Sequence, residues 1–225
     1  AKIDQYDVSE EDNRSTGVSY EGDIKFKDLN GDGKITYGKS TVDDPGDRKI
    51  IGNDQIRLPY SFELNGSWKG FDLRAFFQGV GKRDWYPGHN HHDFWGVYGN
   101  PWSTPIAANR DHWTPENPDA RWPRLKPYIA ENKELALPQT GYLQDASYLR
   151  LKNLTVGYTL PASLTNRWHV ANLRFYFSAE NVLTFHHLDV GGIDPELLTN
   201  TQENVNGAGV YPMQRVYSFG LNLNF

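Results

Sequence analysis

Oxygen-bearing side chains recur at every second position of one short stretch, at Asp28, Asn30 and Asp32. Gly33 follows at the point where a calcium loop of the EF-hand type turns sharply, and the backbone carbonyl of Lys34 would supply the next ligand. Carboxylate, amide and carbonyl oxygens are the ligands that Ca²⁺ prefers. We therefore expect a calcium site with a structural rather than a catalytic role. The competing interpretation is a tight Asn-Gly/Asp-Gly turn that binds no metal.

The acid that closes such a loop is missing from its usual place, because the twelfth position is Lys39. A later acid must complete the site. We assign this role to Asp47, which directly precedes Arg48, and keep Asp43 and Asp44 as its competitors. The predicted ligand set is then Asp28, Asn30, Asp32, the carbonyl of Lys34, and Asp47.

Two further groups of residues could suggest an enzyme. The first is the cluster of His89, His91, His92 and Asp93, and the second is the adjacent pair Asp111-His112. A catalytic zinc site needs ligands at compatible spacing on a rigid scaffold with one open position, and adjacent loop histidines rarely provide this. The sequence also contains no G-x-S-x-G nucleophile motif. We therefore expect no enzymatic activity.

A long aperiodic segment, residues 81–146, carries many prolines and five of the seven tryptophans. Loops of this length are usually functional or disordered, and the aromatic content argues against disorder. The tryptophans could stack on sugar rings, contact a partner, or pack against one another to hold the loop rigid. They are Trp85, Trp95, Trp102, Trp113 and Trp122, and none is singled out as a ligand contact.

The composition narrows the classes of protein that fit. The chain has 225 residues, no cysteine and a formal net charge of -5, so neither a disulfide framework nor a nucleic-acid-binding surface is expected. No run of about 18 apolar residues occurs, which predicts no transmembrane helix. Aromatic residues make up 14 % of the chain, a content that suits girdles at a membrane interface or sugar-binding loops.

Five segments alternate apolar and polar residues with a period of two, which predicts β-strands with one apolar face. In the third segment the apolar residues change parity, which predicts a bulge near Lys152-Asn153. The fifth segment continues to Phe225. The predicted strands are 60–68, 71–78, 148–160, 173–180 and 213–225.

The connections between these strands alternate in length. A turn at 69–70 and a moderate connection at 161–172 alternate with long loops at 81–146 and 183–212. Short turns at one rim and long loops at the other are typical of antiparallel transmembrane β-barrels. We therefore predict an all-β fold in which residues 55–225 form five barrel strands with long extracellular loops, and residues 1–54 form an extracellular loop with the calcium motif.

Five strands are too few for a wide barrel, and the polar, acidic start of the chain reads as the middle of a loop, so we expect a piece of a longer polypeptide. The segment DASYLRLKNL at 145–154, followed by GYTLP at 157–161, resembles a signature of the SusC/RagA-type TonB-dependent transporters of Bacteroidetes. Further stretches resemble the same family in the same order. They are GDIKFKDLNGDG at 22–33, GFDL at 70–73 with FFQG at 76–79, WTPEN at 113–117, and the end of the chain from Tyr211-Pro212.

The resemblance implies a Gram-negative outer-membrane barrel of about 22 strands, of which this chain would supply the last five. It implies TonB-dependent import of a large nutrient, with a glycan favoured and a peptide as the alternative. A SusD-like surface lipoprotein would act as a lid, and TonB would be contacted through an N-terminal region outside these residues. The competing hypothesis is a soluble, calcium-stabilised β-sandwich that binds carbohydrate.

Overall fold

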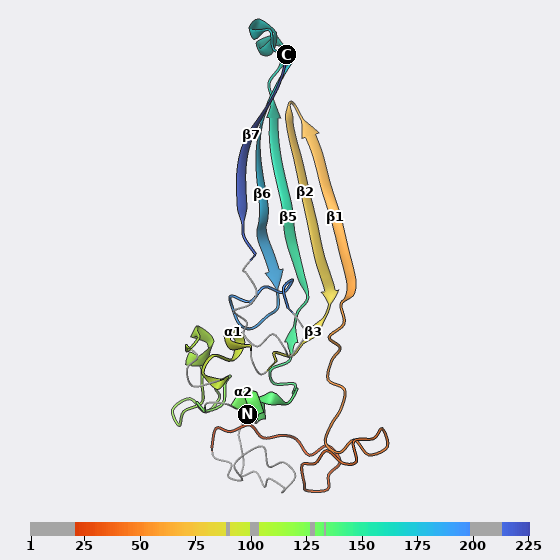
Figure 1. Cartoon of the computed structure of the whole chain (residues 1–225), viewed down its shortest axis with the longest axis vertical. Helices are drawn as coiled ribbons and strands as arrows, with labels where there is room; N and C mark the ends of the chain where they lie inside the picture. The colour runs from red at the N-terminus through yellow and green to blue at the C-terminus, as the bar shows by residue number, and fades with distance from the viewer. Residues whose placement is uncertain (1–20, 89–90, 100–103, 127–128, 133, 199–212) are drawn as a thin grey trace.

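The computed structural model describes residues 21–88, 91–99, 104–126, 129–132, 134–198 and 213–225. The alternating segments form one antiparallel sheet in the order β1-β2-β5-β6-β7 (Figure 1). Its strands are β1 (Arg57–Trp68), β2 (Phe71–Lys82), β5 (Tyr148–Thr159), β6 (Asn172–His186) and β7 (Val216–Asn224). Each of the five segments predicted as strands thus overlaps one of these long strands. Each runs in the opposite direction to its neighbour.

The register places most apolar residues of the five strands on one face of the sheet. Phe62 lies opposite Phe77, and Phe177 lies opposite Phe219, with ring centroids 4.7 and 5.1 Å apart. Although apolar, most of this face is exposed, and Phe219 has 84 % of its surface accessible. Its other exposed members are Leu64, Trp68, Phe71, Leu73, Val156, Phe175, Leu183, Phe185, Tyr217, Leu221 and Leu223.

The opposite face is polar and carries ion pairs between strands. Arg74 of β2 donates to the carboxylate of Glu63 on β1 at 2.8 Å. Arg174 of β6 reaches across β5 to Asp72 of β2, with its Nε 2.9 Å from the carboxylate. Gly157 lies between them, and a Cβ there would come within 2.4 Å of the guanidinium. A glycine at this position of β5 therefore leaves room for the Arg174 side chain.

A bulge occurs where the change of parity predicts it. The register between β5 and β6 shifts between Leu151 and Asn153, and the register between β2 and β5 shifts between Phe76 and Phe77. The bulge returns the apolar residues on both sides of Lys152 to one face. The strand β6 is longer than predicted and continues to His186, so the loop after it begins at residue 187 rather than 183.

The short connections lie at one end of the sheet and the long loops lie at the other (Figure 1). The turn between β1 and β2 lies at the same end as the C-terminus and the short connection containing α3 (Ala162–Thr165) and η5 (Asn166–Trp168). The long loops gather at the other end, together with residues 21–56. Connections that alternate in length along the sequence are thus sorted to opposite ends of the sheet.

The long loops have their own core. A short ladder of β3 (Asp84–Trp85) and β4 (Gln144–Asp145) continues from the sheet. Beyond it lie α1 (His92–Trp95), η2 (Gly96–Tyr98), η3 (Ala107–Arg110), α2 (Ile129–Asn132) and η4 (Glu134–Ala136). Buried aromatic and aliphatic residues from these segments form one cluster. In the described part of the chain, no helix is long and apolar enough to span a membrane.

Candidate binding site and metal loop

Three of the loop tryptophans pack against other aromatic rings in the core of the loop region. Trp85, Trp95 and Trp122 are 2 %, 0 % and 3 % exposed. Trp95 makes an edge contact with Trp122 at 6.0 Å, and Trp122 stacks on Tyr142 at 5.1 Å. These three tryptophans pack in the core of the loop region, and Trp122 also lines the cavity described next. Trp102 lies outside the described residues, and Trp113 is only half-buried.

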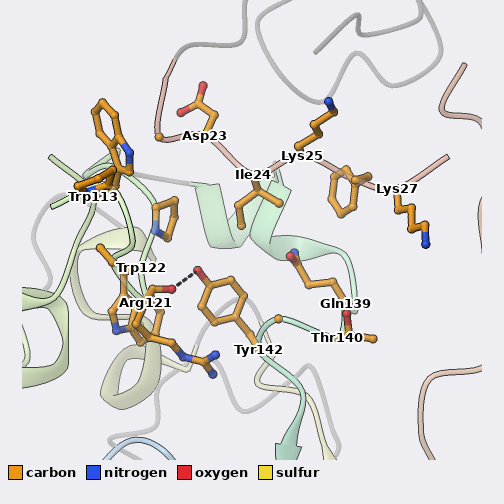
Figure 2. Close-up of a pocket in the computed structure, with 16 residues that line it drawn as sticks. Asp23, Ile24, Lys25, Lys27, Trp113, Arg121, Trp122, Gln139, Thr140 and Tyr142 are labelled. Atoms are coloured by element: carbon orange, nitrogen blue, oxygen red, sulfur yellow. Dashed lines mark hydrogen bonds between the residues drawn. The ribbon is translucent and has the colours of Figure 1, made fainter. Parts of the chain in front are cut away.

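A cavity of about 460 Å³ lies between the start of the described chain and the long loop (Figure 2). One wall is the segment 22–27, and the other includes Gln139, Thr140 and Tyr142. The hydroxyl of Tyr142 donates to the backbone carbonyl of Arg121 at 3.1 Å. Burial raises the pKa of this hydroxyl, so it stays protonated and keeps the bond. The size of the cavity is within the range of ligand sites.

One end of the wall segment is fixed at Gly22 and Asp23. Gly22 has φ +84°, and a Cβ there would lie 2.4 Å from the ring of Trp113, so the backbone can lie directly against the indole. The buried carboxylate of Asp23 pairs with Lys126 at 2.8 Å and with Arg124 at 3.2 Å. The backbone N–H of Arg124 donates to the carbonyl of Gly22 at 2.9 Å. These contacts hold the segment to the long loop although the two are about a hundred residues apart in sequence.

The other end of the wall segment leads into the predicted metal loop. The carboxylate of Asp28 accepts hydrogen bonds from the backbone N–H groups of Gly31, at 2.6 Å, and Gly33, at 2.9 Å. The bond from Gly33, followed by the one from Gly31, lowers the pKa of this carboxyl below its usual value. Asn30 donates through its side-chain amide to Asp32 at 3.1 Å. The structure thus places these three side chains around one turn.

Asp47 is the later acid that reaches this loop. Its carboxylate accepts hydrogen bonds from the backbone N–H of Leu29 at 2.7 Å and of Thr36 at 2.8 Å. The residues between fold back on themselves, since the backbone N–H of Asp47 donates to the carbonyl of Thr36. This excursion explains how Asp47 can follow so late in the sequence. Asp44, by contrast, uses its backbone carbonyl to accept from Lys39 within the excursion.

The loop suits a hard cation in its chemistry, because the side chains gathered there offer only oxygen ligands. Most of these oxygens already accept a hydrogen bond from the loop itself. Among the residues that the structure describes, no three His, Cys, Asp or Glu side chains converge as a metal-binding group. The three acids of the predicted set, Asp28, Asp32 and Asp47, are therefore not gathered into such a group in this structure, and calcium binding stays a prediction.

Three of the residues considered for catalysis, Asp111, His112 and His91, have partners within the loop region. The carboxylate of Asp111 accepts from the backbone N–H of Arg121 at 3.1 Å, and the Nδ1 of His112 lies 2.9 Å from the carbonyl of Asn109. These two side chains therefore bond to separate parts of the loop. His91 makes an edge contact with Trp85 at 5.0 Å. His89 lies outside the described residues.

A buried charge cluster connects the sheet to the loop after β6. The guanidinium of Arg150, 2 % exposed, donates to Asp194 at 2.6 Å and to Thr184 at 2.8 Å. It also donates to Glu196, which accepts from Lys152 at 2.9 Å. The sequence reasoning missed this cluster. Its only local signal was two cations spaced two residues apart among the leucines at the start of β5.

Known proteins with similar sequences were compared with the chain. No protein-family profile matches the chain. The TonB-dependent receptor P3 of Formosa agariphila is 33 % identical over 218 residues, which cover 93 % of this chain and 20 % of that protein. The TonB-dependent receptor P26 of the same organism is 30 % identical over 213 residues, 91 % of this chain and 20 % of that protein.

Solved structures of transporters also match the chain. The structure of the RagAB peptide transporter matches with 29 % identity and a TM-score of 0.51, covering 73 % of this chain and 17 % of that chain. The RagAB peptide importer in its closed-closed state matches with 27 % identity and a TM-score of 0.56, covering 79 % and 18 %.

The sheet, its exposed apolar face and its clustered loops are therefore those of the TonB-dependent receptors. Within that class, the chain belongs to the SusC/RagA-type family. It spans about a fifth of the length of the curated relatives that it matches.

Proposed function

We propose that this chain is part of the barrel of an outer-membrane transporter that imports a large nutrient with energy supplied through TonB. The observation that carries the proposal is the face of the sheet on which apolar residues of all five strands are exposed. Lipid is the environment that favours such a face on an antiparallel sheet, while the polar face suits a wet lumen. The chain itself would catalyse no covalent step.

The separation of the loops supports an assignment of the two ends. Barrels of this type have short turns on the periplasmic side and long loops outside the cell. The loop end would therefore face the medium, and a SusD-like lipoprotein would lie over it, as the paired name of the RagAB structures suggests. TonB would act through parts of the transporter other than this chain.

The competing soluble sandwich has less support. A β-sandwich buries the apolar face of one sheet against a second sheet. In the part of the chain that the structure describes, the five long strands form a single sheet, and the remaining two-residue strands pair with each other. The exposed apolar face would then be left in water, which soluble monomers avoid over such an area.

Two classes of cargo fit a transporter of this family. The resemblance read from the sequence favours a glycan and allows a peptide. The solved relatives with which the chain aligns are described as a peptide transporter and a peptide importer. Either cargo would be too large for passive diffusion through a porin, so uptake would depend on energy.

We also propose that Ca²⁺ stabilises the loop at 28–47. Its ligands would be Asp28, Asn30, Asp32, the carbonyl of Lys34, and Asp47. The bonds from Asp47 to both ends of the turn support this choice over Asp43 and Asp44. The metal would have a structural role, because it would hold the end of the segment that lines the cavity.

Uptake measurements test the proposed function directly. Cells that express the full-length protein should accumulate a labelled oligosaccharide or peptide, and the accumulation should disappear when TonB is deleted. Deletion of the neighbouring SusD-like lipoprotein should reduce it. Accumulation that is equal in the presence and absence of TonB would contradict the proposal.

A further inference from the structure

Residues 24–27 of the wall segment have the features of an unpaired β-strand edge. This stretch belongs to no helix, strand or turn, and Ile24 and Lys25 point to opposite sides of it (Figure 2). Burial alternates in the same way, because Ile24 and Phe26 are half-buried while Lys25 and Lys27 are exposed. This alternation is that of an extended chain with one face toward a core.

The backbone of this segment is available for pairing. Among the described residues, no backbone hydrogen bond involves the N–H or carbonyl groups of residues 24 to 27. An extended chain with free donors and acceptors can bind a second extended chain as an added strand. The cavity of about 460 Å³ beside the segment offers space for a ligand.

Both ends of the edge are anchored, so its shape is set before a ligand arrives. Asp23 is held by Lys126 and Arg124 on one side, and the loop from Asp28 to Asp47 follows on the other. A fixed edge loses less conformational entropy on binding than a flexible one. The predicted metal loop therefore follows directly on the segment that lines the cavity.

The charged residues around residues 24–27 favour a ligand that carries acidic groups. The ionisable residues lining the cavity include the cations Lys25, Lys27 and Arg121, and the only acid among them is Asp23. Asp23 is already paired with two cations, and Arg121 is paired with Asp189. Within the described part of the chain, Lys25 and Lys27 have no ion-pair partner. Both side chains are exposed, and they are two residues apart in the sequence.

We propose that residues 24–27 receive an extended peptide as an added β-strand, with acidic side chains of the peptide opposite Lys25 and Lys27. This site names the cargo class and therefore rests on the proposed transport function. An oligosaccharide fits less well, because it lacks the repeating amides that an edge recognises.

The test uses the full-length transporter in detergent and two probes of about eight residues, which is long enough to pair with the whole segment. The first probe alternates Glu and Val, and the second alternates Lys and Val. We expect the Glu-Val peptide to bind about tenfold or more tightly than the Lys-Val peptide, and less tightly as salt is raised. Equal binding of both probes, or binding of neither, would overturn the proposal.

Backbone pairing is tested by N-methylation of the Glu-Val peptide. Two variants carry N-methyl groups on alternate residues, either at the Glu or at the Val positions. In an added strand, the N–H groups of alternate residues point to the same edge. One variant should therefore lose binding and the other should keep it. Equal affinities for the two variants would contradict strand addition.

Variants of the chain locate the site. The double variant Lys25→Ala/Lys27→Ala should bind the Glu-Val peptide about tenfold more weakly, from the loss of two ion pairs. The matched control is Lys49→Ala/Lys82→Ala, which removes two exposed lysines outside the cavity. An equal effect of both double variants, or displacement of the peptide by maltoheptaose, would overturn the assignment.

Uptake in cells separates this inference from the function on which it rests. TonB-dependent uptake of the Glu-Val peptide that is lowered in Lys25→Ala/Lys27→Ala and normal in the control supports both. TonB-dependent uptake that is unchanged in both variants would overturn the site and leave the transporter assignment intact. Uptake that does not depend on TonB in any variant would contradict the function itself.

Discussion

The carboxylate of Asp47 accepts a hydrogen bond from the backbone N–H of Leu29 at 2.7 Å, which joins the exit of the metal loop to its entrance. The second oxygen of the same carboxylate accepts from Thr36 at 2.8 Å. This pair of bonds brings Asp47 to the turn that carries Asp28, Asn30 and Asp32. It also links the loop to the segment that lines the cavity.

Replacement of Asp47 should weaken calcium binding. Asp47→Asn removes the charge and keeps the shape, so we expect the calcium affinity to fall by about tenfold or more. Asp43→Asn is the control, since Asp43 is exposed and, among the residues that the structure describes, makes no such bond to the loop. Calcium titration of the full-length protein by calorimetry, together with the calcium-dependent shift in Tm, measures the effect. Equal losses in the two variants would show that Asp47 does not close the site.

The strands could be predicted because their cause is local. Alternating apolar residues determine which face of a strand is apolar, and the parity change at Lys152 predicted the bulge that the register shows. Dependence on alternation also explains why the predicted fourth strand ended too early, at residue 180 instead of His186. Asn181 stands where an apolar residue would continue the alternation, has φ +52°, and donates to the carbonyl of Gln214.

The cavity and the charge cluster could not be predicted because they depend on distant contacts. Asp23 meets Lys126, and Arg150 meets Asp194, across stretches of irregular backbone that have no period. Single-sequence reasoning has no rule that pairs such residues. The predicted metal loop is intermediate. Its spacing selected Asp28, Asn30 and Asp32, which lie around one turn, and the later Asp47-Arg48 pair led to the choice of Asp47, which bonds to Leu29. Calcium binding itself stays a prediction.

The contact between Arg150 and Asp194 should hold the loop at 187–198 against the sheet. Arg150→Met removes the cation and leaves two carboxylates, which have 19 % and 23 % of their side chains exposed. Loss of one partner from a fully buried pair costs about 3–5 kcal/mol, so with this exposure we expect the free energy of local opening to fall by about 2 kcal/mol. Hydrogen exchange of residues 187–198 measures it.

The control for this prediction is Arg167→Met, which removes an exposed cation from η5 at the other end of the sheet. Exchange in the loop should be unchanged there. Unchanged exchange in Arg150→Met as well would mean that the cluster does not hold the loop.

A methyl group at Gly22 should disturb the edge of the cavity. Gly22→Ala forces a Cβ to within 2.4 Å of Trp113 and places alanine at φ +84°, for which we expect a local cost of about 1–3 kcal/mol. Gly191→Ala is the control, because a Cβ there meets nothing within 4 Å. Faster hydrogen exchange in residues 21–27 should appear only in Gly22→Ala. Similar exchange in both variants would exclude the close packing described here.

The loop region should lose stability in mild acid through His91. Burial lowers the pKa of His91, with a smaller opposing effect of Asp93 and a further lowering by His92. The unfolded state then binds a proton near pH 6.5 that the folded state does not, so stability should fall as the pH drops below about 6.5. His91→Phe keeps a ring against Trp85 and removes the titration. A smaller decrease in Tm from pH 7.5 to 5.5 in this variant checks the prediction, and identical decreases would contradict it.

The central claim is that the exposed apolar face of the sheet contacts lipid, and Phe219 tests it most directly. In water, Phe219→Arg at a residue 84 % exposed should cost almost nothing, whereas an Arg on the lipid face near the membrane centre costs about 2–4 kcal/mol. Ser218→Arg, on the polar face of the same strand, is the control. We predict that the amount of folded protein in the outer-membrane fraction, measured by its shift in gel mobility on boiling, drops sharply for Phe219→Arg and stays near normal for Ser218→Arg. Equal and normal amounts of both variants would contradict the account.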